Sequence, residues 1–173
     1  MLRLKRAKIF ADFANNLASL SKCTEKHVAA VITDKDMTQV YSIGINGGPV
    51  GGMDCMCQLG GKYGCVHAEI NALVKCTSDA KDKIMFVTMS PCVSCAAAII
   101  NAPGSFYAVY YNEQWKNTEG LELLHKAGVH TIDMSSIMQN NPVDVSLVNT
   151  DNMIDVPFES REVFLKGTWG NNK

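Results

Sequence analysis

The sequence predicts an α/β fold, because strand-like and helix-like segments alternate along most of its 173 residues. Short runs rich in β-branched and aromatic residues are typical of strands. The stretches between them carry apolar residues at helical spacing. Chains that alternate in this way build sheets with parallel members. The length fits one domain that can bury its own core.

The first half of the chain is expected to form one helix, two paired strands and a long loop. Residues 4–22 carry apolar side chains close to a helical period, and the basic opening LRLKRAK is expected to be solvated helix surface. Residues 27–34 and 39–46 have strand patterns and are joined by the turn-like DKDM. The Gly-rich residues 47–64 fit neither pattern. Loops of this length in compact domains tend to be functional.

The second half alternates between helices and strands. One helix begins with a proline, which the first turn tolerates, and the last helix is expected to be capped by glycine. Residues 135–173 show no pattern that assigns an element. In chain order we predict helix 67–76, strand 83–89, helix 91–102, strand 105–111, helix 118–127 and strand 129–134.

Charge and composition disfavour several classes of partner. The formal net charge is −1, whereas nucleic-acid binders usually carry a basic excess, so we expect no nucleic-acid polymer as partner. No apolar run approaches the ~20 residues of a membrane span, and the first residues lack signal-peptide features. We therefore expect a cytoplasmic protein without membrane association. Thiols are kept reduced there, so the seven cysteines favour metal binding over disulfides.

Two cysteines three positions apart follow a proline in SPCVSC, residues 90–95. Such a pair can be a redox couple, half of a metal site or one end of a disulfide. The reducing compartment argues against the disulfide, and a redox couple explains neither His67 nor Glu69 in VHAEIN. Cys92, Cys95 and His67 together offer two thiolates and one imidazole. On zinc this set leaves a fourth position for water, as in catalytic sites.

Glu69 lies two residues after the candidate ligand His67. It is placed to accept a proton from water activated by zinc and to pass it to a substrate. The combined pattern His-x-Glu…Pro-Cys-x-x-Cys is the signature of zinc-dependent deaminases. We therefore predict a catalytic Zn²⁺ held by His67, Cys92 and Cys95, with Glu69 as the catalytic acid–base.

Motifs between residues 21 and 133 resemble those of the cytidine deaminase superfamily, in particular the phage and bacterial deoxycytidylate (dCMP) deaminases. The resemblance implies a three-layer cytidine deaminase-like fold, a mixed five-stranded sheet flanked by helices. It places the deaminase domain at 1–133 and a C-terminal extension of that domain at 134–173. The motifs are SKC (21–23), VAAVI (28–32), IGINGGPVGG (43–52), HAEINAL (67–73), MFVTMSPCVSC (85–95) and EGLELLHKAGV (119–129).

The activity that this resemblance implies is hydrolysis of dCMP to dUMP and ammonia for thymidine nucleotide synthesis. By position in the family, Asn46 would hold the sugar, and Ser21 and Lys22 would lie near the substrate phosphate. Each also has a plainer interpretation. An Asn in a turn tolerates positive φ, while Ser21 and Lys22 can be a helix end and a surface charge.

The resemblance also implies regulation and assembly. Family members are often activated by dCTP and inhibited by dTTP, sometimes with Mg²⁺, and commonly form homohexamers. Glycine N–H groups can approach phosphates closely, although a flexible loop and a capped helix face are the simpler interpretation. If the gene is of phage origin, the enzyme would act in the host cytoplasm. The residues at the position of the effector site are Gly47, Gly48, Gly51, Gly52 and Asn71.

Four cysteines surround the Gly-rich loop, and several family members carry a second, structural zinc there. Four thiolates make a closed tetrahedral set. Cys76 is then left as the unpaired thiol, expected to be a small buried hydrophobic residue. The implied ligands of the second Zn²⁺ are Cys23, Cys55, Cys57 and Cys65.

Three departures from the family pattern bear on substrate choice. Ala29 replaces a usual glycine, while Ile45 and Trp115 stand where tyrosine is common. Changes near the base and sugar can admit dCTP alongside dCMP. A nucleoside cytidine deaminase is the next alternative. The net charge disfavours a tRNA-adenosine deaminase, and Glu69 disfavours a non-catalytic zinc module, which needs no proton shuttle.

Overall fold

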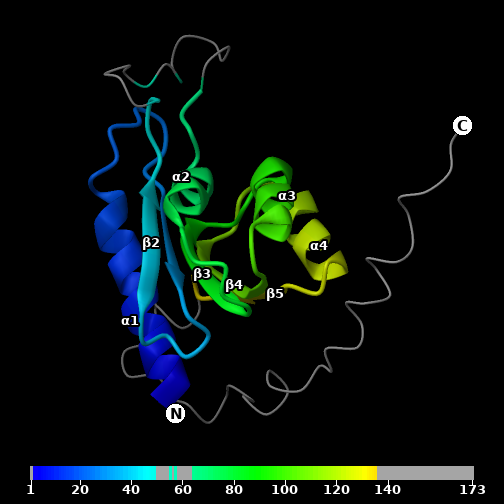
Figure 1. Ribbon diagram of the computed structural model, residues 1–173. Coiled ribbons are helices and arrows are strands. Elements are labelled where there is room, and N and C mark those ends of the chain that lie inside the picture. The colour runs from blue at the N-terminus through cyan, green and yellow to red at the C-terminus, as the bar shows by residue number, and fades with distance from the viewer. Residues whose placement is uncertain (1, 50–54, 56, 58–63, 136–173) are drawn as a thin grey trace, which may run out of the picture.

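The computed structural model describes residues 2–49, 55, 57 and 64–135 (Figure 1). Gly51, Gly52 and nearly all of the extension predicted at 134–173 lie outside these residues. The predicted order of helices and strands is confirmed in the described part of the chain. The elements are α1 (Leu2–Ala18), β1 (Ala29–Thr33), β2 (Val40–Ile45), α2 (Ala68–Lys75), β3 (Lys83–Met89), α3 (Val93–Asn101), β4 (Phe106–Glu113), α4 (Glu119–Lys126) and β5 (His130–Asp133).

The described strands form one mixed sheet in the order β2-β1-β3-β4-β5. β1 is antiparallel to both of its neighbours, whereas β3, β4 and β5 are mutually parallel. α1 covers one face, and α2, α3 and α4 cover the other (Figure 1). The predicted three-layer α/β fold with a mixed five-stranded sheet is therefore confirmed. None of the helices built from the described residues is long and apolar enough to cross a membrane.

α1 packs on the sheet through small residues rather than through its large apolar ones. Its buried positions are all alanines, whereas Leu2 and Ile9 are 64% and 63% exposed. Alanines allow the helix axis to approach the strands closely, and Phe10 stacks on Phe86 of β3 with ring centroids 5.4 Å apart. The periodicity predicted the helix but not its buried face. The helix also ends at Ala18, before the predicted residue 22.

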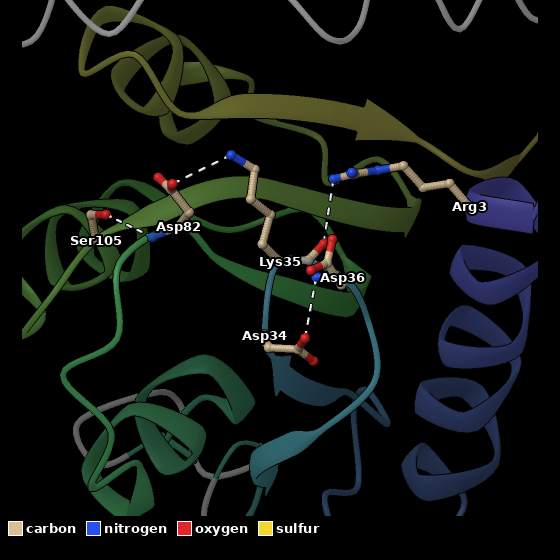
Figure 2. Close-up of polar contacts among 6 residues, drawn as sticks. All are labelled: Arg3, Asp34, Lys35, Asp36, Asp82 and Ser105. Carbon is tan, nitrogen blue, oxygen red and sulfur yellow. Dashed lines mark hydrogen bonds and ion pairs between the residues drawn. The ribbon is translucent and has the colours of Figure 1, made fainter.

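A polar network closes one end of the sheet, where β1 ends and β3 begins (Figure 2). Lys35 and Asp82 form an ion pair of 3.3 Å, and Arg3 of α1 donates a hydrogen bond of 3.4 Å to the carbonyl of Lys35. The backbone N–H of Asp82 donates to Oγ of Ser105 at 2.9 Å. These contacts join α1, the β1–β2 turn and the segments before β3 and β4. The candidate site lies at the opposite end of the sheet.

Lys83 is buried, with 1% of its surface exposed, at the start of β3. Its ammonium donates hydrogen bonds to the carbonyls of Ser78, Ala80 and Pro103, at 3.3, 3.0 and 2.5 Å. Burial lowers the pKa of Lys83. Three carbonyl partners match the three protons of a lysine ammonium, so the side chain joins the loops before β3 and β4.

Replacing Lys83 with methionine is therefore expected to destabilise the fold by about 2–4 kcal/mol, because three backbone carbonyls lose the donor that this buried lysine provides. Urea unfolding measures this change. Lys81→Met, at an exposed position two residues away, is the matched control and is expected to change stability by less than about 0.5 kcal/mol. Equal stabilities of the two variants would contradict the structural role of Lys83.

Candidate metal centre and active site

The candidate site lies where the carboxyl ends of β2 and β3 meet the first residues of α2 and α3. His67 is the N-terminal cap of α2, and Cys92 is the N-terminal cap of α3. Pro91 precedes this cap, so the prediction that proline lies in the first helical turn was wrong by two positions. α/β folds commonly bind ligands at the carboxyl edge of their sheets. The helix starts add partial positive charge there, which favours thiolates.

His67, Cys92 and Cys95 meet in one cluster, as the sequence predicted. Nδ1 of His67 lies 3.3 Å from Sγ of Cys95 and 3.6 Å from Sγ of Cys92. Ligands of tetrahedral zinc are about 3.5–3.8 Å apart, from bonds of about 2.0–2.3 Å. The spacing of the three donors therefore fits one zinc ion and leaves a fourth position. Burial raises the pKa of the Cys95 thiol, so metal binding has to displace its proton.

Glu69 lies beside this cluster in the first turn of α2 and is 4% exposed. Its carboxyl group hydrogen-bonds with the thiol of Cys95. Burial raises the pKa of Glu69, and the neighbouring His67 opposes this shift. A carboxyl group with a raised pKa is suited to general acid–base chemistry near neutral pH. Its place beside the donors agrees with the predicted proton-transfer role.

Two glycines allow the ligand-bearing segments to approach their neighbours, and the sequence analysis did not single them out. A Cβ on Gly44 of β2 would lie 2.0 Å from the carbonyl oxygen of Ala68, so α2 rests directly on the strand. A Cβ on Gly120 of α4 would lie 2.0 Å from the carbonyl oxygen of Pro91 and 2.8 Å from the carbonyl carbon of Cys92. The backbone at Cys92 therefore rests against α4. Glycine favours neither strands nor helices, so a glycine inside a predicted strand or helix was the sequence signal that could have marked these two positions.

A pocket of about 270 Å³ opens beside the cluster. This volume is near the lower end of small-ligand pockets, roughly 300 Å³. Trp115 contributes to the wall, and its backbone N–H donates to Oγ of Ser90 at 2.7 Å. The described residues that line the pocket are Cys23, Glu25, Lys26, Val28, Asn46, Cys57, Gly64, Cys65, His67, Ala68, Glu69, Met89, Ser90, Cys92 and Trp115.

Asn46 lines this pocket and is 7% exposed. Its Oδ1 accepts hydrogen bonds from Oγ of Ser21 (2.6 Å) and from the N–H of Val28 (2.9 Å), while its Nδ2 donates to the carbonyl of Lys26 (2.7 Å). The described non-glycine residues with positive φ are Met37 and Asp82, so the turn explanation for Asn46 is wrong. Its amide retains one N–H for a ligand.

Ser21 and Lys22, predicted near the substrate phosphate, do not line the pocket formed by the described residues. Ser21 is buried, and its hydroxyl is engaged with Asn46 and with the N–H of Cys23 at 3.1 Å. Lys22 is exposed. Lys26 does line the pocket. Lys26 is also exposed, and the sequence analysis did not single it out, because sequence spacing does not show which of two nearby lysines borders a pocket.

The four cysteines predicted to hold a second zinc also meet, with their sulfur atoms within 4.8 Å of one another. Sγ of Cys55 lies 3.5 Å from Cys23 and 2.9 Å from Cys65, and Sγ of Cys57 lies 3.7 Å from Cys23 and 3.5 Å from Cys65. Hydrogen bonds from Cys65 and Cys57 lower the pKa of Cys55 to about 5. Burial and the neighbouring thiols raise the pKa of Cys65, so metal binding has to displace its proton. The four sulfurs match the ligand set of a closed metal site, in which Cys55 and Cys65 would lie farther apart than 2.9 Å. Cys76 is only half-buried, outside both clusters.

Of the described residues of the predicted effector site, Gly47 and Gly48 follow the end of β2, whereas Asn71 lies in α2. Gly47 pairs with Val66 in an isolated antiparallel bridge, and Nδ2 of Asn71 donates to the carbonyl of Ile45 at 2.8 Å. Gly48 follows and is half-buried. Asn71 therefore fastens α2 to β2, and these contacts by themselves point to no effector.

Comparison with known proteins defines the class. The chain belongs to the cytidine and deoxycytidylate deaminase family, whose zinc-binding region matches residues 4–112. It is therefore a zinc-binding deaminase of the hydrolytic class. Residues 4–112 include the two cysteine-containing clusters and Glu69.

Particular relatives are similar over much of the chain. ComE operon protein 2 of Bacillus subtilis is 31% identical over 146 residues, covering 75% of this chain and 71% of the relative. A probable deoxycytidylate deaminase of Caenorhabditis elegans is 32% identical over 57% of this chain and 54% of its own length. The dCMP deaminase of cyanophage S-TIM5, solved in complex with dCMP and dUMP, superimposes with a TM-score of 0.65 at 28% identity, covering 73% of this chain and 95% of that chain.

Proposed function

We propose that this protein deaminates dCMP hydrolytically to dUMP and ammonia, with a zinc ion held by His67, Cys92 and Cys95. The observation that carries this proposal is the cluster of three metal donors, two of which, His67 and Cys92, line one pocket together with the buried Glu69. The similarity to a phage dCMP deaminase solved with dCMP and dUMP supports the choice of substrate. The domain that performs this reaction is proposed to span residues 1–133.

Each residue has a distinct part in the reaction. Zinc, when bound, activates water for attack on the ring carbon that carries the amino group. Glu69 would take one proton of the water and give it to ring N3, and would then carry the remaining proton of the attacking hydroxyl to the amine, so that the C–N bond breaks, ammonia leaves and the hydroxyl oxygen becomes the carbonyl of dUMP. Asn46 offers its free N–H to the sugar. Trp115 lies on the pocket wall, where it can contact the base or sugar.

Phosphate recognition is proposed to depend on Lys26. Of the described residues that line the pocket, Lys26 and His67 are basic, and His67 is committed to the metal. Asn46 fixes the backbone of Lys26 through its hydrogen bond to the Lys26 carbonyl. A lysine ammonium on a flexible stem binds phosphate as a point charge. Lys22 is proposed to be a surface charge.

Lys26→Met is accordingly expected to raise KM for dCMP about tenfold and to leave KM for deoxycytidine unchanged, since only the nucleotide carries a phosphate. Steady-state kinetics with both substrates measures the difference. Lys22→Met is the matched control and is expected to leave both values unchanged. A reversed pattern, with Lys22→Met affecting dCMP alone, would restore the assignment of Lys22.

The experiment that tests the substrate is a panel of dCMP, dCTP, CMP, deoxycytidine and tRNA, with ammonia release as the readout. The proposal predicts the highest kcat/KM for dCMP. Turnover of deoxycytidine without turnover of dCMP would make the protein a nucleoside deaminase, and comparable turnover of dCTP would widen its range. Failure of every substrate with a zinc-loaded protein would favour a non-catalytic zinc module.

Regulation and assembly are proposed from the family resemblance. Gly47, Gly48 and Asn71, with Gly51 and Gly52, would bind a nucleotide effector with Mg²⁺, with dCTP activating and dTTP inhibiting a homohexamer. Adding dTTP at subsaturating dCMP is then expected to lower the rate. Rates that respond to neither nucleotide would remove the regulatory site from the proposal.

A further inference from the structure

The four-cysteine cluster forms part of the same pocket as the catalytic cluster. Cys23, Cys57 and Cys65 line the pocket together with His67 and Cys92, whereas Cys55 belongs to the cluster without lining the pocket. A zinc ion that only stabilised the long loop would not need to lie beside the pocket. Three of the four cysteines that would hold this ion form part of the pocket wall.

A chain of hydrogen bonds connects Cys23 to the pocket residue Asn46. The backbone N–H of Cys23 donates to Oγ of Ser21 at 3.1 Å, and this hydroxyl donates to Oδ1 of Asn46 at 2.6 Å. Asn46 in turn bonds to the backbone of Val28 and Lys26, which also line the pocket. The buried hydroxyl of Ser21 thus links the metal-ligand segment to the residues proposed to bind sugar and phosphate.

A second connection runs through the backbone from Cys65 to His67. Val66, the residue between them, donates to the carbonyl of Gly47 at 2.8 Å and accepts from the N–H of Gly47 at 3.2 Å. This bridge holds Val66 against the end of β2. Cys65 and His67, on either side of Val66, belong to the two different clusters. Movement of Cys65 would therefore be transmitted directly to the start of α2.

We propose that the four-cysteine cluster, linked to Asn46 by Ser21, sets the shape of the substrate pocket, so that loss of its metal weakens nucleotide binding rather than slowing the chemical step. This inference rests on the proposed function. A metal holds four sulfurs at mutual distances that otherwise depend on weak thiol hydrogen bonds. Without the metal, the segments containing Cys23 and Cys65 are free to separate. Ser21 is a positioning residue and does not contact the substrate.

The test compares Cys55→Ser, Ser21→Ala and the control Cys76→Ser, none of which changes a residue that lines the pocket. For each protein we would measure zinc per chain, the Kd of the product dUMP by titration, and kcat and KM for dCMP. Binding of dUMP reports on the pocket without turnover.

The expected result for Cys55→Ser is a fall from two zinc ions per chain to one, a roughly tenfold rise in the Kd of dUMP and the KM of dCMP, and a kcat within about threefold of wild type. Ser21→Ala should keep both zinc ions and still raise the Kd about three- to tenfold, because one buried hydrogen bond to Asn46 is lost. Cys76→Ser should match wild type in every measurement.

Three outcomes would overturn the inference. They are one zinc ion per chain in the wild-type protein, loss of one zinc from Cys55→Ser with unchanged Kd and KM, and a fall in kcat at unchanged KM. If Cys55→Ser does not fold, Ser21→Ala decides, and an unchanged Kd with both zinc ions present refutes the link. A wild-type protein that neither binds dUMP nor deaminates dCMP would instead refute the proposed substrate.

Discussion

Replacing Glu69 with glutamine is expected to reduce kcat for deamination by at least about 10²–10⁴-fold while the zinc content stays the same. Glutamine preserves the shape of the side chain beside Cys95 but cannot transfer protons. Ammonia release and metal analysis on the same preparation measure the two quantities. The matched control is Glu25→Gln, which alters an exposed carboxylate that also lines the pocket.

The same substitution is expected to stabilise the metal-free protein at neutral pH. Burial raises the pKa of Glu69 in the folded state above its ordinary value of 4.5. The folded state therefore favours the protonated carboxyl group, and its stabilising contribution is complete below pH 4.5 and is lost as the pH rises through the folded pKa. Glutamine carries no charge, so the stability gain over wild type should grow with pH. This trade of stability for activity is common at active sites.

Urea unfolding with a chelator present, at acidic and neutral pH, measures that gain. Two results would contradict the role assigned to Glu69. One is a variant that keeps more than a tenth of the wild-type kcat, and the other is a stability difference that shrinks as the pH rises. Glu25→Gln should show neither the loss of activity nor the stability gain.

Gly120→Ala is expected to weaken zinc binding at the catalytic cluster, although Gly120 is not itself a ligand. Alanine is favoured over glycine inside a helix by about 1 kcal/mol. The added Cβ, however, would lie 2.0 Å from the carbonyl oxygen of Pro91, so the backbone at Cys92 has to move. Overpacking costs about 1–3 kcal/mol or more, and it outweighs the gain in helix propensity. Displacing a ligand should lower zinc affinity roughly 10–100-fold.

Competition with a chromophoric chelator measures this affinity, and Lys126→Ala, at an exposed position of the same helix, is the control. The control should match wild type. Equal zinc affinities of Gly120→Ala and Lys126→Ala would show that the contact between α4 and Pro91 does not position Cys92.

The cluster of His67, Cys92 and Cys95 could be predicted from sequence because its members belong to short, local patterns. His67 and Glu69 are two residues apart and Cys92 and Cys95 are three apart, so each pair fixes its own geometry at a helix start. The strand between them, β3, brings the two pairs to one edge of the sheet. The fold was predictable for a similar reason, since alternating strand and helix patterns are visible within single segments.

The residues that support the site were not predictable in this way, because their contacts join distant segments. Gly120 and Pro91 are 29 positions apart, and Gly44 meets Ala68 across 24 positions. The sequence likewise does not show which lysine borders the pocket. The motif SKC suggested Lys22, whereas Lys26 lines it. Ser21 was predicted to lie near the substrate phosphate, whereas its hydroxyl is engaged with Asn46 and Cys23.

The most direct test of the central claim is the product balance of the purified protein acting on dCMP, with zinc removed and then restored. We predict one dUMP and one ammonia for each dCMP consumed, with loss of turnover after chelation and its recovery on addition of Zn²⁺. A zinc-loaded protein that leaves dCMP unchanged, or turnover that persists after zinc is removed, would contradict the account.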